Sequence, residues 1–308
     1  MKEQDKELSE LNENGKEIPL KQDNSEKVQD KNKFFSFSKI LLFIVVGAIL
    51  IFGIIYIIKI YKKMNSKIEL IITENYDEMS KKAADIIADI IKKNPNAHLG
   101  LATGGTPIGL YKELINKYQN KEISFKNIKT FNLDEYCDIP IDHKQSYYTY
   151  MQNNLFSHID IDPKNTFIPK GEGDILKNIQ EYEKLLEKYK INMQLLGIGS
   201  NGHIGFNEPG TKFDMGVHQV LLTQNTIKDN ARFFDDDIDQ VPKKAITMGI
   251  KNIIDAECII LVANGENKAD AIKSIMDGKI DINIPATALN THKGKVYIII
   301  DKKAACKL

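Results

Sequence analysis

The chain has 308 residues, of which 42% are hydrophobic and 27% are charged, enough for one large globular domain or two small ones. Lysine plus arginine and aspartate plus glutamate number 42 each, so the formal net charge is zero. Without a basic excess, the composition argues against a nucleic-acid-binding protein. Cys137, Cys258 and Cys306 are too far apart for a metal or redox motif, so we expect reduced thiols and no metal site.

The N-terminal part differs sharply from the rest. Residues 1–35 alternate lysine with acidic and amide side chains, and we predict a disordered tail because they offer little apolar surface to bury. Residues 40–58, "ILLFIVVGAILIFGIIYII", carry no charge, and about 20 such residues span a bilayer. We therefore predict a transmembrane anchor with its flanks over 36–63. A cleavable signal peptide or a buried core helix fits less well, and balanced flanking lysines leave the orientation open.

From Met64 onward, apolar runs of strand length alternate with helical periodicity. Residues 77–94 and 179–190 place apolar side chains at helical spacing. This alternation predicts an α/β fold, a three-layer, mainly parallel Rossmann-like sheet with helices on both faces, within one domain of residues 64–308. In such sheets ligands bind beyond the carboxyl ends of the strands. The predicted strands are 67–73, 98–102, 128–133, 193–199, 258–263 and 295–301.

The first polar motif at a strand end is "LATGGTPIGLYKEL", residues 101–114. Two glycines turn the chain, and Thr106-Pro107 opens the next helix. Free backbone amides at a helix N-terminus favour an anion such as phosphate. The alternative is an ordinary tight turn capped by Thr106. The motif is neither a Walker P-loop nor a GxGxxG dinucleotide loop.

The second motif, "TFNLDEYCDIP", places Asp134 and Glu135 directly after a strand. A carboxylate there can accept a proton from a carbon next to a carbonyl. Spacing alone favours the simpler interpretation, in which Asp134 caps the next segment and Glu135 is solvated.

The third motif, "GIGSNGHIGFNEPG", covers residues 197–210. His203 can exchange protons near neutral pH from this glycine-rich loop, and Glu208 can orient it or balance its charge. A purely structural histidine is the alternative. Two cations complete the set of candidates, Arg232 and Lys268. A lysine in the first turn of a helix opposes the helix dipole, which a bound phosphate would offset, although a solvated surface lysine is the commoner case.

Together, "TGGTP", "FNLDEY", "SYYTYM", "GIGSNGHIGFNEPG" and "ARFF" resemble the glucosamine-6-phosphate deaminase (isomerase) family from about residue 67 to the C-terminus. The resemblance implies conversion of D-glucosamine 6-phosphate and water into D-fructose 6-phosphate and ammonia. This is hydrolysis of a C–N bond in amino-sugar breakdown, and it needs no cofactor. A 6-phosphogluconolactonase would share the glycine loop but not the Asp134 segment or Glu208. A membrane-tethered sugar-phosphate sensor is a further alternative.

The resemblance also implies roles for individual residues. His203 assists opening of the sugar ring, supported by Glu208 and Asn201, and Asp134 moves a proton between C2 and C1. Many family members have aspartate where this chain has Asn201, so we expect Glu208 to carry more of the orienting role. Residues 222–243 correspond to a mobile lid. The implied phosphate ligands are Thr103, Gly104, Gly105, Thr106, Arg232 and Lys268.

The sequence says less about the cellular location and the oligomeric state of the protein. Because phosphorylated sugars are cytosolic metabolites, we expect a single-pass membrane protein with its catalytic domain on the cytoplasmic side. The partners we expect are the small-molecule substrate, the membrane through residues 40–58, and no nucleic acid. The sequence leaves the oligomeric state open.

Overall fold

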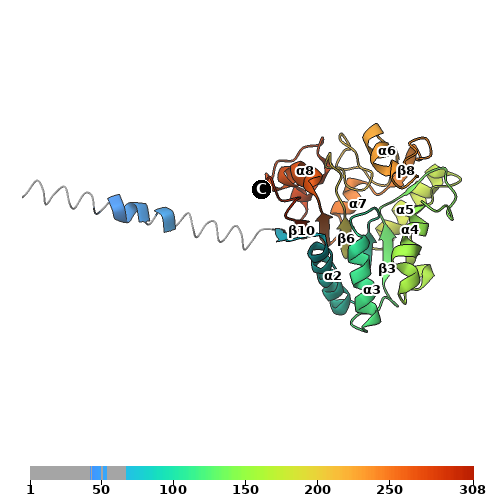
Figure 1. The fold of residues 1–308 in the computed structure, drawn as a ribbon, viewed down its shortest axis with the longest axis horizontal. Helices are drawn as coiled ribbons and strands as arrows, with labels where there is room; N and C mark the ends of the chain where they lie inside the picture. The colour runs from blue at the N-terminus through green and yellow to red at the C-terminus, as the bar shows by residue number, and fades with distance from the viewer. Residues whose placement is uncertain (1–41, 43, 50, 54–66) are drawn as a thin grey trace, which may run out of the picture. The chain divides into compact units, whose positions relative to one another are not determined.

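The computed structural model describes residues 42, 44–49, 51–53 and 67–308. The chain divides into two compact units, Met1–Ser66 and Lys67–Leu308. The second unit holds every strand and helix named below, and Figure 1 shows its helices arranged around a central sheet.

A seven-stranded sheet forms the centre of this unit, and all its neighbouring strands are parallel. All six predicted strands belong to it, so the predicted α/β fold with a mainly parallel sheet is confirmed. The seventh strand was not predicted because two residues show no periodicity. In spatial order the strands are β1 (Ile68–Thr73), β10 (Lys295–Asp301), β9 (Cys258–Ala263), β6 (Met193–Leu196), β2 (His98–Leu101), β3 (Lys129–Asn132) and β5 (Thr166–Phe167).

The helices begin where local capping allows. In α5 the Asp174 side chain accepts a hydrogen bond from the Lys177 amide at 3.0 Å, so the helix starts before the predicted residue 179. Helices α2 and α3 lie side by side (Figure 1). The α-helices are α2 (Tyr76–Lys93), α3 (Ile108–Gln119), α4 (Tyr147–Asn154), α5 (Ile175–Lys188), α6 (Gln224–Ala231), α7 (Ile250–Ile254) and α8 (Ala269–Met276). The 3-10 turns are η1 (Phe156–His158), η2 (Pro163–Asn165), η3 (Glu266–Lys268) and η4 (Pro285–Thr291).

A second, antiparallel sheet was not predicted. It has the order β4 (Asp134–Tyr136), β8 (Lys244–Thr247) and β7 (His218–Leu221). Leu133 joins the two sheets, because its amide donates to the Leu101 carbonyl at 3.1 Å and its carbonyl accepts from the Met248 amide at 2.7 Å. The chain therefore leaves the central sheet at Leu133, and Asp134 follows at the junction.

A separate apolar cluster holds α6 against this second sheet. Tyr136 of β4 and Ala245 of β8 pack with Ile227 and Ala231 of α6, and Phe234 is buried among them. Apolar burial stabilises such contacts by roughly 25 cal/mol per Å². The segment 222–243, for which the resemblance implied a lid, therefore packs against the second sheet through this separate apolar cluster.

The predicted membrane anchor is not supported in the described residues. Of residues 40–58, residues 40, 41, 43, 50 and 54–58 lie outside the described residues, as does the predicted tail over 1–35. No helix in the described ranges is long and apolar enough to cross a membrane. The predicted single-pass membrane location with a cytoplasmic catalytic domain is therefore wrong.

Candidate active site

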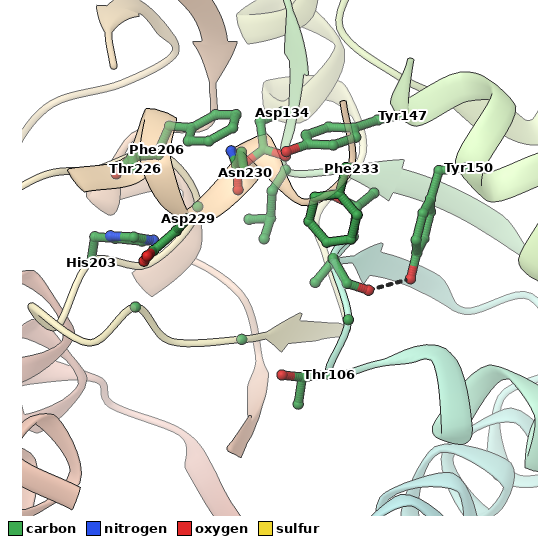
Figure 2. A pocket seen from close by; sticks show the side chains of 18 of the residues that line it. Thr106, Asp134, Tyr147, Tyr150, His203, Phe206, Thr226, Asp229, Asn230 and Phe233 are labelled. Carbon is green, nitrogen blue, oxygen red and sulfur yellow. Dashed lines mark hydrogen bonds between the residues drawn. The ribbon is translucent and has the colours of Figure 1, made fainter. Parts of the chain in front are cut away.

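A pocket opens where the loops after β2 and β6 meet β4 and α6 (Figure 2). These loops follow the carboxyl ends of parallel strands, where ligands bind in α/β sheets. Asn201 and Glu208 are not in the pocket wall but contact His203 from behind. The other predicted site residues all line the pocket: Thr103, Gly104, Gly105, Thr106, Asp134, His203, Arg232 and Lys268.

The glycine loop after β2 is held in place by tyrosine hydroxyls. Tyr150 donates to the Gly104 carbonyl at 2.7 Å, and Tyr76 donates to the carbonyls of Gly105 at 3.3 Å and Thr106 at 3.1 Å. Within the described residues, the Gly104 and Gly105 amides donate to no group. Free amides in a loop that leads into a helix form an anion-binding cradle.

Thr106 does not cap α3, as the alternative interpretation required. Its hydroxyl donates to Asn264 Oδ1 at 3.2 Å, and the N-cap position belongs to Pro107, which has no side-chain cap bond. The loop is therefore fixed to the end of β9 across the pocket. An ordinary threonine-capped turn does not describe it.

Two cations face the pocket beside this cradle. Arg232 directly follows α6, and Lys268 directly precedes α8. Burial lowers the pKa of Lys268; Asp229 opposes that effect and Arg232 adds to it. Neither cation forms an ion pair with any residue in the described part of the chain. Two nearby unpaired cations beside free amides suit a phosphate group.

Asp134 is buried at the start of β4 and reaches the pocket wall. Burial raises the pKa of its carboxyl to about 8, and the charge of Glu135 acts in the same direction. Tyr147 points its hydroxyl toward Asp134 in Figure 2. Because Asp134 is a strand residue, it does not cap a helix or turn. Its position and raised pKa suit a general base.

Glu135 is not solvated, contrary to the simpler interpretation of the sequence. Its buried carboxylate accepts hydrogen bonds from the amides of Tyr136 at 2.9 Å, Tyr147 at 2.8 Å and Tyr148 at 3.0 Å. Burial raises the pKa of Glu135 to about 7, and these three bonds oppose the rise. The dipole of α4 also stabilises a negative carboxylate at the first turn of the helix. Glu135 therefore anchors α4, and Asp134 alone of the pair faces the pocket.

His203 is enclosed on the side away from the pocket. Its Nδ1 lies 3.6 Å from Glu208 Oε2 and makes no hydrogen bond within the described residues. Burial lowers the pKa of the imidazole; Glu208 raises it, Lys268 lowers it and Asp229 raises it. A Cβ on Gly199 would lie 2.3 Å from the imidazole ring, so only glycine lets the backbone pass beneath it.

Glu208 is held by several donors. Asn201 Nδ2 donates to its Oε2 at 2.9 Å, while the hydroxyls of Thr226 and Thr223 donate to Oε1. The Asn201 Oδ1 in turn accepts from the His203 amide at 3.1 Å. Asn201 therefore links the histidine backbone to the glutamate carboxylate, a role that a neutral amide fills because it offers both a donor and an acceptor.

Several pocket residues were not predicted. Tyr147 and Tyr150 lie three apart on α4, inside the quoted motif "SYYTYM", yet nothing in their local pattern indicated what they face. On α6, Thr226, Asp229 and Asn230 line the pocket as well. The three-residue spacing of Thr226, Asp229 and Arg232 was the available signal for a shared helix face.

Comparison with known proteins agrees with this geometry. The family model described as glucosamine-6-phosphate isomerases/6-phosphogluconolactonase matches residues 73–298. Glucosamine-6-phosphate deaminase of Clostridium novyi (strain NT) is 54% identical over 237 residues, which are 76% of this chain and 98% of that protein. Its counterpart in Clostridium botulinum (strain Langeland / NCTC 10281 / Type F) is 51% identical over 241 residues, 78% of this chain and 98% of the relative.

Solved structures give the same result. A monomeric glucosamine-6-phosphate deaminase superposes with a TM-score of 0.76 at 45% identity, covering 78% of this chain and all of that one. The 6-phosphogluconolactonase of Trypanosoma brucei superposes with a TM-score of 0.66 at 19% identity, covering 78% of this chain and 98% of that one, which shows a shared fold alone. The chain belongs to the glucosamine-6-phosphate isomerase/6-phosphogluconolactonase family.

Proposed function

We propose that this protein is a glucosamine-6-phosphate deaminase, which converts D-glucosamine 6-phosphate and water into D-fructose 6-phosphate and ammonia. Relatives of that name at about half identity support the proposal. The observation that carries it is the buried Asp134 carboxyl, which opens into the same pocket as a cradle for phosphate.

The substrate phosphate binds the free amides of Gly104 and Gly105, together with the side chains of Thr103, Thr106, Arg232 and Lys268. Arginine offers two parallel N–H donors to phosphate oxygens, and Lys268 adds a point charge. The incoming dianion offsets the repulsion between these cations. Anchoring the phosphate in this way places the sugar ring between His203 and Asp134.

His203 opens the ring. Its neutral imidazole, the form that burial favours, accepts the proton of the C1 hydroxyl and returns a proton to the ring oxygen as the C1–O5 bond breaks. Glu208 lies beside Nδ1 and stabilises the positive charge that forms on the ring. Asn201 hydrogen-bonds to both Glu208 and the His203 backbone and so fixes their relative position.

Asp134 then isomerises the open chain. Its carboxylate takes the proton from C2, the C2–H electron pair forms a C1=C2 double bond, and the C1 oxygen is protonated. Asp134 returns its proton to C1, and the nitrogen lone pair forms a C2=N bond. Water adds to C2 and ammonia leaves, so the overall change is hydrolysis of a C–N bond. A raised pKa strengthens this carboxylate as a base toward a carbon acid.

The test is an assay of the full chain with D-glucosamine 6-phosphate, measuring ammonia and D-fructose 6-phosphate separately. The proposal predicts that both products appear in equal amounts without added cofactor. A parallel assay with 6-phosphogluconolactone addresses the main alternative. Hydrolysis of the lactone without ammonia release from the amino sugar would refute the proposal.

A further inference from the structure

One face of α6 delivers three polar side chains to the pocket. Thr226, Asp229 and Arg232 are spaced by three residues, a spacing that places side chains on one side of a helix, and all three line the pocket. The Thr226 hydroxyl binds Glu208, and Arg232 lies beside the phosphate cradle. Asp229 comes between them in this row and has no role in the reaction as described above.

The Asp229 carboxylate is unengaged. It makes no hydrogen bond and no ion pair with any residue that the structure describes. Figure 2 shows it directed toward the imidazole of His203, and its charge acts on both His203 and Lys268. A charged side chain at a pocket wall with no partner is available to act on whatever charge develops there.

Within its own loop, His203 has one nearby carboxylate, Glu208, and it makes no hydrogen bond to it. Glu208 Oε2 stands 3.6 Å from Nδ1, beyond hydrogen-bond distance, and this carboxylate already accepts from Asn201 and two threonine hydroxyls. The charged groups that face His203 are Glu208, Lys268 of η3 and Asp229 of α6. Burial and Lys268 disfavour an imidazolium, and in its own loop His203 has Glu208 as the one carboxylate that opposes them; Asp229 of α6 is the other negative charge.

We propose that Asp229 is a positioning residue that supplies the second negative charge for the His203 imidazolium during ring opening. The inference rests on the proposed function. The proton passes from the C1 hydroxyl to His203 and then to the ring oxygen, and none is transferred to Asp229. Thr226 and Asp229 lie on one face of α6. The same helix therefore holds Glu208 through the Thr226 hydroxyl and adds the negative charge of Asp229 near His203.

The test compares Asp229→Asn, Asp229→Glu and the control Asp235→Asn in the full chain. Asp235 is an exposed carboxylate paired with Lys144 at 2.8 Å, so its loss removes the same charge away from the pocket. The pKa of His203 is followed by NMR with labelled histidine, assigned by the signal missing in His203→Gln. The acid limb of kcat/KM for D-glucosamine 6-phosphate is measured alongside.

Asp229→Asn lowers the pKa of His203, moves the acid limb to lower pH and reduces kcat about three- to tenfold, a small part of the ~10²–10⁴ that acid–base catalysis contributes. Asp229→Glu restores most of both values, and Asp235→Asn changes neither. An unchanged His203 titration in Asp229→Asn overturns the proposal. The titration needs no turnover, so absence of ammonia release would count against the proposed function alone.

Discussion

Burial and the neighbouring Glu135 hold Asp134 in its neutral form, with a pKa raised from 3.8 to about 8. The folded protein therefore keeps a proton on this carboxyl that the unfolded chain has already lost between these two pH values. The free energy of unfolding contributed by Asp134 is highest at low pH and falls as pH rises toward 8. A catalytic base in this environment costs stability under the conditions in which it is ionised.

Asp134→Asn removes that cost because the amide stays neutral at every pH. We predict that its advantage in free energy of unfolding over the wild type grows by ~3 kcal/mol between pH 6 and pH 9. Urea unfolding at the two pH values measures this difference. An advantage that stays constant with pH would show that Asp134 is not the buried acid we describe.

The backbone at Gly199 determines where the His203 imidazole lies. A methyl group at this position would come 2.3 Å from the ring, whereas one at Gly197 meets nothing within 4 Å. We predict that Gly199→Ala lowers the free energy of unfolding by about 1–3 kcal/mol and displaces His203, with a corresponding loss of turnover. Gly197→Ala changes the free energy of unfolding by less than about 0.5 kcal/mol. Equal stabilities of the two variants would contradict the contact.

The sequence made His203 and Glu208 candidates because both lie in one short loop after a strong strand signal. Spacing alone could not separate Asp134 from Glu135, and only the resemblance favoured Asp134. Adjacent strand residues point to opposite faces, and the three-dimensional contacts show which face meets the pocket. Two of the three amides that donate to Glu135 lie some twelve residues further along the chain, in α4. That capping arrangement has no local signature.

At the scale of elements, α6 ends at Arg232, which lines the pocket beside the proposed phosphate site. We predict that Arg232→Gln lowers kcat/KM for D-glucosamine 6-phosphate by about 10- to 100-fold, the cost of lost charged hydrogen bonds. Toward unphosphorylated glucosamine, the variant and the wild type should differ little. A similar loss with both sugars would mean that Arg232 acts through the fold and not through phosphate.

Six of the seven strands of the central sheet were predictable because buried strands such as β9 and β10 are largely apolar runs between turn signals. The sheet of β4, β8 and β7 was not. Its strands have only three or four residues, and β4 pairs with a segment more than a hundred residues away. Such pairing depends on tertiary contacts, here the small apolar cluster around Tyr136, and not on local periodicity.

At the scale of the whole molecule, the unit Lys67–Leu308 contains both apolar clusters and the entire pocket. Residues 64–308, the predicted catalytic domain, therefore should fold and act independently of residues 1–63. We predict that a chain of residues 64–308 unfolds cooperatively and keeps the kcat and KM of the full chain. Circular dichroism during heating and the ammonia assay check this. Loss of folding in the shortened chain would show that the N-terminal segment contributes to the core.

The most direct test of the central claim follows the proton that Asp134 is proposed to move. D-glucosamine 6-phosphate with deuterium at C2 is given to the full-length wild type and to Asp134→Asn. The account predicts that the wild type transfers part of the deuterium to C1 of D-fructose 6-phosphate, and that the variant loses turnover by ~10³ or more. A variant that still turns over near the wild-type rate and still moves deuterium from C2 to C1 would contradict it.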